Sequence, residues 1–248
     1  MSALSEGLWV RVGGGMQEVG TGRRHGPADP SFPPPGGPWS ELRHNGRLIG
    51  WSPQGAVSRG VVRRAEEEGA RLIQERRAYL LRRLGHKVRS SVLALQESAR
   101  QAAFGRQELL EEIHDQALDV GKRAFAMTAV ALDPVDPARS VVVGAVLNLA
   151  APGADRTLPA DAVVRAPEPV LVEALTRAYE WMGGPGSAIR GDLEGHWLRL
   201  EMEPAPGRRP LQIPELGEPL VRYLVDTHLE GWLDVSLAER VLIYLPAA

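Results

Sequence analysis

The chain has 248 residues, of which 44% are apolar and 24% charged, so it is long enough for one or two folded domains and its composition argues against wholesale disorder. The formal net charge of −2 disfavours a generally basic nucleic-acid-binding protein. The absence of cysteine excludes disulfides, thiolate zinc sites, iron–sulfur clusters and cysteine nucleophiles, and it favours a reducing compartment.

The sequence shows no sign of membrane targeting. The longest apolar stretch, around Val141–Ala151, is about half as long as a helix that crosses a bilayer. The first residues, MSALSEGLWVRV, have neither the charged start nor the apolar centre of a signal peptide. We therefore expect a soluble, cytoplasmic protein that does not associate with membranes.

The distribution of charge divides the chain into three predicted units. Residues 1–56 carry a net charge of +1, residues 57–133 carry +3, and residues 134–248 carry −6. A basic middle unit followed by an acidic one indicates separate structural roles for the two.

The first unit, residues 1–56, is predicted to be small and rich in β-structure. Six prolines between Gly26 and Trp39 impose an extended, loop-like path. A hairpin is expected on either side, one turning at the three glycines of LWVRVGGGMQEVG and the other at Asn45-Gly46 in ELRHNGRLIGW. We interpret this unit as the remnant of a sensor module.

The second unit, residues 57–133, is predicted to form two long helices. Between Val57 and Phe104 there is no proline, and apolar or small residues recur every three or four positions: Val62, Ala65, Gly69, Leu72, Ile73, Tyr79, Leu80, Leu84, Val88, Val92 and Leu95. A similar pattern follows Gly105, from Leu109 to Ala131, and ends at Asp133-Pro134. A stripe this long needs a partner, so we expect an antiparallel helical hairpin that two chains complete as a dimeric four-helix bundle.

The third unit, residues 134–248, changes to a mixed α/β pattern. ARSVVVGAVLNLAA reads as a helix or a buried strand, and helices are expected at Glu168–Met182 and Pro214–Leu229. Strands are expected in ADAVVRA, SAIRGDLEG, HWLRLEMEP and GWLDVSLAERVLIYLP. Two or three helices over a mostly antiparallel sheet make an α/β sandwich, so the predicted fold class is α+β with a helical hairpin before the sandwich.

The segment LGHKVRSSVLAL, Leu84–Leu95, resembles the phospho-acceptor motif S-H-E-L-R-T-P-L of sensor histidine kinases. His86 matches the phosphorylated histidine, Arg89 matches the arginine, and Ser90 stands where threonine or asparagine is usual. Lys87 replaces the acidic neighbour and Ser91 replaces the proline. The order of elements continues the resemblance from Val57 to the C-terminus, which implies a dimerisation and histidine-phosphotransfer hairpin followed by a GHKL-type ATPase domain.

The resemblance also indicates that the ATPase domain is degenerate. PVLVEALTRAYEWM aligns with the asparagine-rich helix of the family, with Glu173 and Arg177 at the two asparagine positions. An arginine at the second position would repel the Mg²⁺ that asparagine normally binds. Glu203 and Gly207 stand in the adenine-binding D-x-G-x-G loop, where Ala205 replaces a glycine.

The remaining nucleotide-binding motifs of the family are also depleted. Gly217 is what remains of the G-L-G-L segment, and Glu215 and Glu218 stand near the expected phosphate position. Only seven residues separate Gly207 from Glu215, too few for the usual ATP lid. We therefore expect no bound nucleotide, no other cofactor and no metal.

The surroundings of His86 suit phosphoryl transfer. Arginine and lysine occupy positions 76, 77, 82, 83, 87 and 89, and no acidic residue lies between Glu75 and Glu97. Nearby cations keep an imidazole neutral and nucleophilic, and they attract phosphoryl oxygens and an acidic partner. The alternative interpretation is a solvated histidine on an inherited basic face. A nucleic-acid-binding stripe is disfavoured because no aromatic residues interleave with the cations.

Other histidines and the tryptophans have structural interpretations. His114 lies among acidic residues and reads as a surface histidine, and His228 is explained by its position at a helix end. Trp181, Trp197 and Trp232 are expected in the core of the third unit.

The predicted function is therefore two-component signalling, in which His86 exchanges a phosphoryl group with the aspartate of a response-regulator receiver domain, assisted by Arg89 and Ser90. Histidine phosphotransferases of phosphorelays are similar in having a kinase-like architecture that no longer binds ATP. A divergent but active sensor kinase and a non-catalytic pseudokinase scaffold remain as alternatives. The expected partners are a second copy of the chain and a receiver domain, with no nucleic acid.

Overall fold

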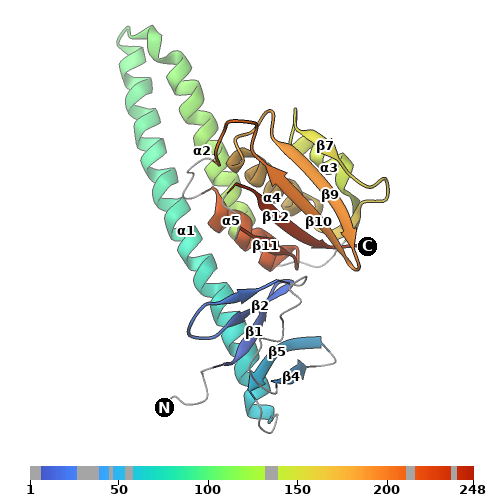
Figure 1. The fold of residues 1–248 in the computed structure, drawn as a ribbon. Helices are drawn as coiled ribbons and strands as arrows, with labels where there is room; N and C mark the ends of the chain where they lie inside the picture. The colour runs from blue at the N-terminus through green and yellow to red at the C-terminus, as the bar shows by residue number, and fades with distance from the viewer. Residues whose placement is uncertain are drawn as a thin grey trace.

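The computed structural model describes residues 7–26, 39–44, 47–53, 58–131, 139–210, 216–235 and 239–248. Figure 1 shows a small N-terminal sheet, a long pair of helices and a C-terminal α/β unit (residues 139–248, as described). Among the predicted features, the Asn45-Gly46 turn, the helix stop at Asp133-Pro134 and Glu215 lie outside the described residues.

The N-terminal sheet contains both predicted hairpins. Its strands are β1 (Trp9–Val12), β2 (Gly15–Glu18), β3 (Arg24–His25), β4 (Trp39–His44) and β5 (Arg47–Pro53), in the order β3-β2-β1-β5-β4. All pairs are antiparallel, and the β1–β2 turn needs Gly13 at a φ of 65°. The alternating apolar side chains of the sheet pack on α1, in a small core formed by Leu8, Val10, Val12, Val19, Leu42 and Ala65. The sheet is therefore fixed to the long helix by apolar contacts.

The two predicted helices are present. α1 spans Arg59–Ala103 and begins at Ser58, whose side chain accepts a hydrogen bond from the Val61 amide. A short 3₁₀ turn, η1 (Gln107–Leu109), precedes α2 (Leu110–Ala131), and the two long helices lie side by side in antiparallel fashion (Figure 1). The buried positions of α1, which are Ala65, Gly69, Leu80, Leu84 and Ser98, mostly fall on the predicted stripe.

The C-terminal unit alternates strands and helices much as predicted. Its strands are β6 (Arg139–Val142), β7 (Asp155–Thr157), β8 (Val163–Ala166), β9 (Ala188–Glu194), β10 (Trp197–Glu203), β11 (Trp232–Asp234) and β12 (Val241–Pro246). Its helices are α3 (Val143–Ala150), α4 (Glu168–Trp181) and α5 (Glu218–Tyr223), the last continued by the π-helical turn η2 (Leu224–His228). The stretch predicted as helix or strand contains both, because β6 leads directly into α3.

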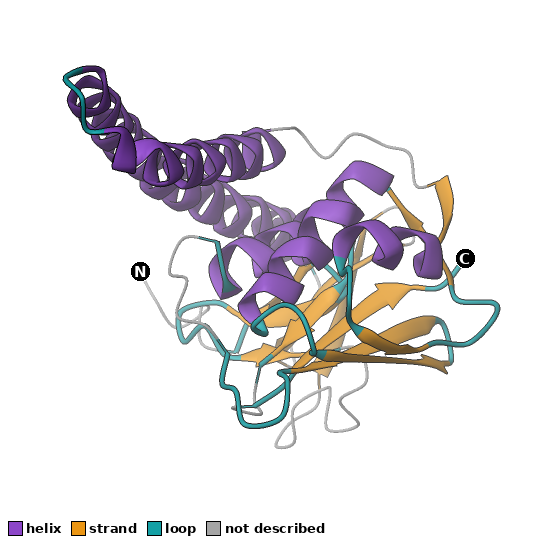
Figure 2. Ribbon diagram, turned by 90° about the horizontal axis from the view of Figure 1, so that it is seen from above, coloured by secondary structure: helices purple, strands orange, loops and turns teal. Residues whose placement is uncertain are grey.

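The C-terminal unit has two layers. Its main sheet has the order β11-β12-β10-β9-β7, and only the β7–β9 pair is parallel, as expected for a mostly antiparallel sheet. β6 and β8 form a separate two-stranded sheet. Figure 2 shows the helices gathered on one face of the main sheet, which gives the predicted α/β layering.

The helical pair and the C-terminal unit share one hydrophobic core. Leu80 and Leu84 of α1 and Ala126, Ala129 and Val130 of α2 join the buried residues of α3, α4, α5 and the main sheet in a single cluster. The Tyr223 hydroxyl donates to the carbonyl oxygen of Val130 at 3.4 Å. The end of the helical pair opposite its connecting turn is therefore packed into the C-terminal unit.

Two of the three tryptophans expected inside the third unit lie elsewhere. Trp232 is buried, but the Arg24 guanidinium lies 4.1 Å from its ring, and a Cβ on Gly15 would overlap that ring. Trp197 is half-buried beside Gly14. Both therefore pack against the N-terminal sheet, whereas Trp181 packs against the expected core.

His228 stands in the last turn of η2, at the helix end where it was predicted. It is also buried, with its ring centroid 5.6 Å from that of Tyr223 in an edge-to-face arrangement. Packing against this aromatic ring is a contact that the sequence did not predict.

Candidate functional site

The predicted phospho-acceptor, His86, lies on the exposed face of α1. Leu84 is fully buried in the shared core, and Val88 is half-buried. His86, Arg89 and Ser90 are exposed, because residues two positions apart on a helix are separated by about 200°. The helical pattern that buries Leu84 therefore exposes the imidazole to solvent.

The helix continues without a break past His86. Where the family motif has proline, Ser91 donates to Asp119 of α2 at 3.1 Å, and Arg123 donates to the same carboxylate oxygen at 2.8 Å. These interactions, the Arg123 bond first, hold the pKa of Asp119 below its ordinary value. Ser91 and Asp119 thus tie α1 to α2 about one turn beyond the histidine.

Positive charge dominates the exposed surface around His86. Arg82, Arg83, Lys87 and Arg89 are all exposed on the same stretch of α1. Ser90, one turn after the histidine, donates its hydroxyl proton to the backbone carbonyl of His86 at 3.1 Å. This surface presents an exposed imidazole among cations.

The predicted nucleotide positions on α4 form a buried ion network. Arg177 and Glu173 have side-chain exposures of 4% and 5%, and the Arg177 Nε donates to Glu173 Oε1 at 2.7 Å. The Arg177 Nη1 donates to Glu180 Oε2 at 2.6 Å. Burial alone lowers the pKa of Arg177, but its bonds to Glu173 and Glu180 outweigh burial and raise it above the ordinary value. Arg177 is therefore a fixed cation.

This network has no room for a magnesium ion at Arg177. The two carboxylates nearest the guanidinium already accept its protons, and a divalent cation there would meet a buried positive charge. Lys122 of α2 extends the network, because its Nζ lies 2.9 Å from Glu180 Oε1. Glu180, which also accepts from Arg177, thus connects α4 to α2.

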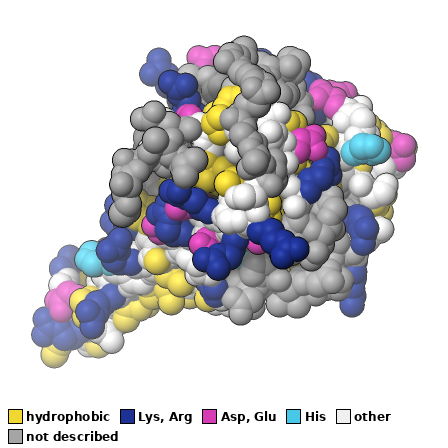
Figure 3. Space-filling model, turned by 90° about the horizontal axis from the view of Figure 1, so that it is seen from below, with side chains coloured by type: hydrophobic (Ala, Val, Ile, Leu, Met, Phe, Trp, Pro, Cys, Tyr) yellow, Lys and Arg dark blue, Asp and Glu magenta, His cyan; other side chains and the backbone are white. Residues whose placement is uncertain are grey.

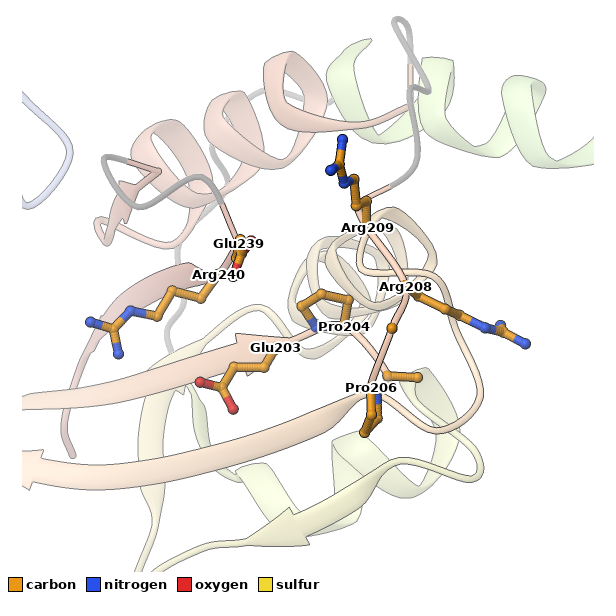
Figure 4. A pocket seen from close by; sticks show the side chains of 9 residues that line it. Glu203, Pro204, Pro206, Arg208, Arg209, Glu239 and Arg240 are labelled. Carbon is orange, nitrogen blue, oxygen red and sulfur yellow. The ribbon is translucent and has the colours of Figure 1, made fainter.

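The remaining predicted nucleotide residues line an open hollow or lie apart from it. A hollow of about 650 Å³ is lined by Glu203, Pro204, Ala205, Pro206, Gly207, Arg208, Arg209, Glu239 and Arg240. Figure 4 shows Arg208, Arg209 and Arg240 pointing in three different directions, so their guanidinium groups do not converge on one anion. Gly217 is not among the lining residues, and it precedes the first residue of α5.

Two of the charged side chains that line this hollow form ion pairs with neighbouring residues. Glu203 pairs with Arg190 at 3.1 Å, and Arg240 pairs with Glu201. Glu218 of α5 does not line the hollow; it pairs with Arg222 at 2.7 Å, and burial raises the pKa of Glu218. In the part of the chain that the structure describes, no group of three or more His, Asp or Glu residues is arranged to hold a metal ion.

One charged cluster was not found from the sequence. Arg24 of β3 and Arg76 of α1 both donate to the buried carboxylate of Asp226 in η2. These residues are up to 202 positions apart, so no local pattern joins them. The available signal was a single acid inside the apolar run LVRYLVDTHL.

Comparison with solved structures gives the fold. The chain is similar to the histidine kinase ThkA, solved in complex with the response regulator protein TrrA, with a TM-score of 0.53 and 12% identity over 98% of this chain and 79% of that one. It aligns more loosely with the Acinetobacter baumannii histidine kinase AdeS, with a TM-score of 0.49 and 14% identity over 65% and 97% of the two chains. For a histidine kinase from Burkholderia phymatum STM815 the values are 0.28 and 16%, over 70% and 97%.

No protein-family model and no curated protein matches the sequence. The likeness to ThkA extends over nearly the whole chain, and at this identity it concerns the fold alone. The chain therefore has the fold of a histidine kinase core. Within the described residues, no helix has both the length and the apolarity needed to cross a membrane.

Proposed function

We propose that this chain is a two-component signalling protein in which His86 exchanges phosphoryl groups with the aspartate of a response-regulator receiver domain, without binding ATP. The observation that carries the proposal is the exposed imidazole of His86 on a basic helical surface, directly opposite the buried Leu84. The fold shared with ThkA supports it, since that kinase was solved with a response regulator.

The residues around His86 suit the reaction in either direction. The unprotonated ring nitrogen attacks the phosphorus of an aspartyl phosphate, the new N–P bond forms as the P–O bond breaks, and the aspartate leaves as a carboxylate. Lys87 and Arg89 would stabilise the phosphoryl oxygens as charge shifts between them. Because Lys87 replaces the acidic neighbour, the residue that follows His86 cannot act as a carboxylate base.

The ion network on α4 supports the absence of ATP. Arg177 occupies the position of a magnesium ligand, and its charge is compensated by Glu173 and Glu180 rather than by a phosphate. Together with the diverging arginines of Figure 4, this network favours a receiver phosphate over a nucleotide as the phosphoryl source. We propose that the C-terminal unit descends from an ATPase domain and now has a structural role.

Apolar side chains along the helical pair support a homodimer. Several are exposed in the single chain, namely Leu93, Phe104, Leu110, Leu118 and Phe125, with Phe104 83% exposed. Figure 3 shows hydrophobic side chains along the projecting arm, among arginines and lysines. A second copy of the chain would cover this surface in a four-helix bundle. The cytoplasmic location and the boundaries 1–56, 57–133 and 134–248 belong to the same proposal.

The test is transfer of labelled phosphate. Receiver domains that carry radiolabelled phosphate are mixed with the parent chain, with His86→Gln and with His114→Gln. His114 is an exposed histidine of α2, so His114→Gln is the matched control for the change at His86 of α1. We expect acid-labile label on the parent and on the control but none on His86→Gln. Equal labelling of all three chains, or of none, would overturn the proposal, and unlabelled chains that still bind receivers would support a scaffold.

A further inference from the structure

The N-terminal sheet contacts two other parts of the molecule in different ways. Its apolar core includes Ala65 of α1, with Val61, Val62 and Leu72 packed against it. Toward the C-terminal unit it packs against Trp197 and Trp232 and also makes polar contacts, beginning with the Gly14 amide, which donates to the Gly231 carbonyl at 2.7 Å. Figure 1 shows β1 and β2 beside α1 and next to the C-terminal unit.

The charged contacts centre on Asp226, whose side chain is completely buried. Arg24 of the sheet and Arg76 of α1 donate to the same oxygen, Asp226 Oδ2, and the Arg76 bond is 2.9 Å long. The Arg76 Nη2 donates to the Gln17 side-chain oxygen of β2. The Arg24 side chain is 17% exposed and that of Arg76 is 23% exposed, so the cluster is shielded from bulk water. One carboxylate thus joins three segments, β3, α1 and η2.

Backbone packing brings these segments close together. A Cβ on Gly13 would lie 2.5 Å from the Asp226 carbonyl oxygen and 2.6 Å from that of Gly231, so only glycine fits this turn. Trp232 supplies the other wall, with the Arg24 guanidinium over its ring. The ion pairs are therefore held in a defined geometry.

Every element around Asp226 contributes a polar group to its surroundings. Arg222 of α5 adds a favourable charge, and the Leu233 amide of β11 donates a hydrogen bond to Asp226. Arg222 itself pairs with Glu218 and donates to the Leu233 carbonyl at 3.0 Å. Beside Asp226 is an open hollow of about 690 Å³, whose polar and charged lining groups are Arg11, Glu66, Thr227 and Glu230.

The cluster is incompletely satisfied. Asp226 Oδ1 and the Arg24 atoms Nε and Nη1 are buried without a hydrogen-bond partner in the described structure. Unsatisfied buried polar groups oppose the contact that buries them. Burial also raises the pKa of Asp226 to about 7, against the opposing effects of Arg76 and Arg222. The contact is specific in geometry and weakened by its own desolvation, which suits a contact that opens.

We propose that Arg24, Arg76 and Asp226 form a releasable clasp, by which the N-terminal sheet and α1 hold the C-terminal unit in place, and that opening it alters access to His86. The sheet stays fixed to α1 through its apolar core. The C-terminal unit then turns about its apolar contact with the helical pair, which is formed by Leu80 and Leu84 of α1 and by Ala126, Ala129 and Val130 of α2. Leu84 lies two residues from His86. The effect on His86 rests on the proposed function, whereas the clasp itself does not.

The clasp is tested by a distance measurement. Because the chain has no cysteine, spin labels can be placed at Thr21→Cys in the sheet and His196→Cys between β9 and β10, both exposed positions. We expect one narrow distance in the parent at pH 8 and a broad, longer distribution in Arg24→Gln/Arg76→Gln. Arg71→Gln, which removes an exposed arginine of α1 paired with Glu68 and Glu75, should match the parent.

A second variant approaches the clasp from its other side. Asp226→Ala removes the shared acceptor, and it should broaden the distribution in the same way. Near-ultraviolet circular dichroism confirms that each variant is folded. Folded variants that keep the parental narrow distance would overturn the clasp.

The regulatory part is tested by phosphoryl transfer. Arg24→Gln/Arg76→Gln should accept label from a charged receiver faster than the parent and than Arg71→Gln. A broadened distance with an unchanged rate would overturn the link to His86 and leave the clasp standing. If the parent accepts no label while the distances change as expected, the proposed function fails and the clasp stands.

Discussion

His86 and Arg177 both lie on helices of a histidine kinase-like fold, and their surroundings are opposite. His86 is exposed on α1 among cations, with Leu84 buried behind it. Arg177 is buried on α4, and its charge is neutralised within the chain by Glu173 and Glu180. An exposed side chain is accessible to a partner protein, whereas a buried and paired one is not, and this difference underlies the proposal of phosphoryl transfer at α1 and a structural role at α4.

The difference also extends to how each helix is held. α1 near His86 is anchored by apolar side chains on one face and leaves the other face open. α4 is anchored by apolar contacts and by an ion network that reaches Lys122 of α2. Substitutions at the two helices should therefore have separable effects on stability and on transfer.

The largest expected effect is loss of stability in Arg177→Ala. Removing the guanidinium leaves Glu173 buried without its partner, which costs about 3–5 kcal/mol. Urea unfolding followed by circular dichroism measures it. The matched control is Arg71→Ala on α1, whose exposed ion pairs are worth at most about 1 kcal/mol. Equal losses in the two variants would contradict the buried network.

Leu84→Ala should lose nearly as much stability as Arg177→Ala. Leu84 is fully buried between the helical pair and the C-terminal unit, and truncating a buried leucine costs about 2–5 kcal/mol. Leu93→Ala, at a position 60% exposed in the single chain, is the control. A second chain in the proposed bundle would cover Leu93, so a loss at Leu93 that shrinks as the protein is diluted to monomers would support the bundle, and no loss at Leu84 would contradict the shared core.

Protonation of Asp226 should change the free energy of unfolding by a smaller amount, which depends on pH. Its pKa in the folded chain, about 7, lies above the ordinary value of 3.8 because burial disfavours the charged form. The folded chain therefore binds this proton more tightly than the unfolded chain. The resulting stabilisation is complete below pH 3.8 and is lost as the pH rises through 7.

The measurement compares the parent with Asp226→Asn in urea between pH 5 and pH 8. Asparagine keeps the shape of the neutral acid, so the free energy of unfolding of the parent should fall relative to that of the variant as the pH rises. All other titrating groups are common to the two chains and cancel in the difference. Parallel pH profiles would contradict the assignment of a raised pKa to Asp226.

Sequence patterns predicted the local parts of this structure well. The spacing of apolar residues gave both long helices, and glycine and alternation gave the hairpins of the N-terminal sheet, because these features depend on neighbours within a few residues. The same spacing includes Leu84 in the apolar stripe and leaves His86 outside it, and in the structure Leu84 is buried and His86 is exposed. The histidine kinase-like order of elements agrees with the fold of ThkA.

Features that depend on distant contacts were missed. The pairing of Arg24 with Asp226, and the packing of Trp232 on the N-terminal sheet, join segments about 200 residues apart. The buried state of Arg177 was equally invisible, because an arginine at a helical position reads as exposed unless its acidic partners are known to be buried with it. The sequence had identified Arg177 as hostile to magnesium without revealing that its charge is already neutralised.

The smallest expected effect is the shift of melting temperature with Mg-ATP, which should be absent. A ligand stabilises the state that binds it in proportion to the logarithm of its concentration over its dissociation constant, so nucleotide at 100 times that constant adds about 2.7 kcal/mol. At millimolar Mg-ATP, a kinase domain that binds the nucleotide would show a clear rise in melting temperature. Arg177 and its two carboxylates leave no place for the metal, so the melting temperature of this chain should not change.

Arg177→Asn restores an amide at the position of the resemblance but leaves Glu173 and the diverging arginines of the hollow unchanged, so its melting temperature should not change either. A rise in the melting temperature of the parent would indicate that the C-terminal unit binds Mg-ATP as an active kinase does. It would also require Arg177 to leave the partners that now hold it.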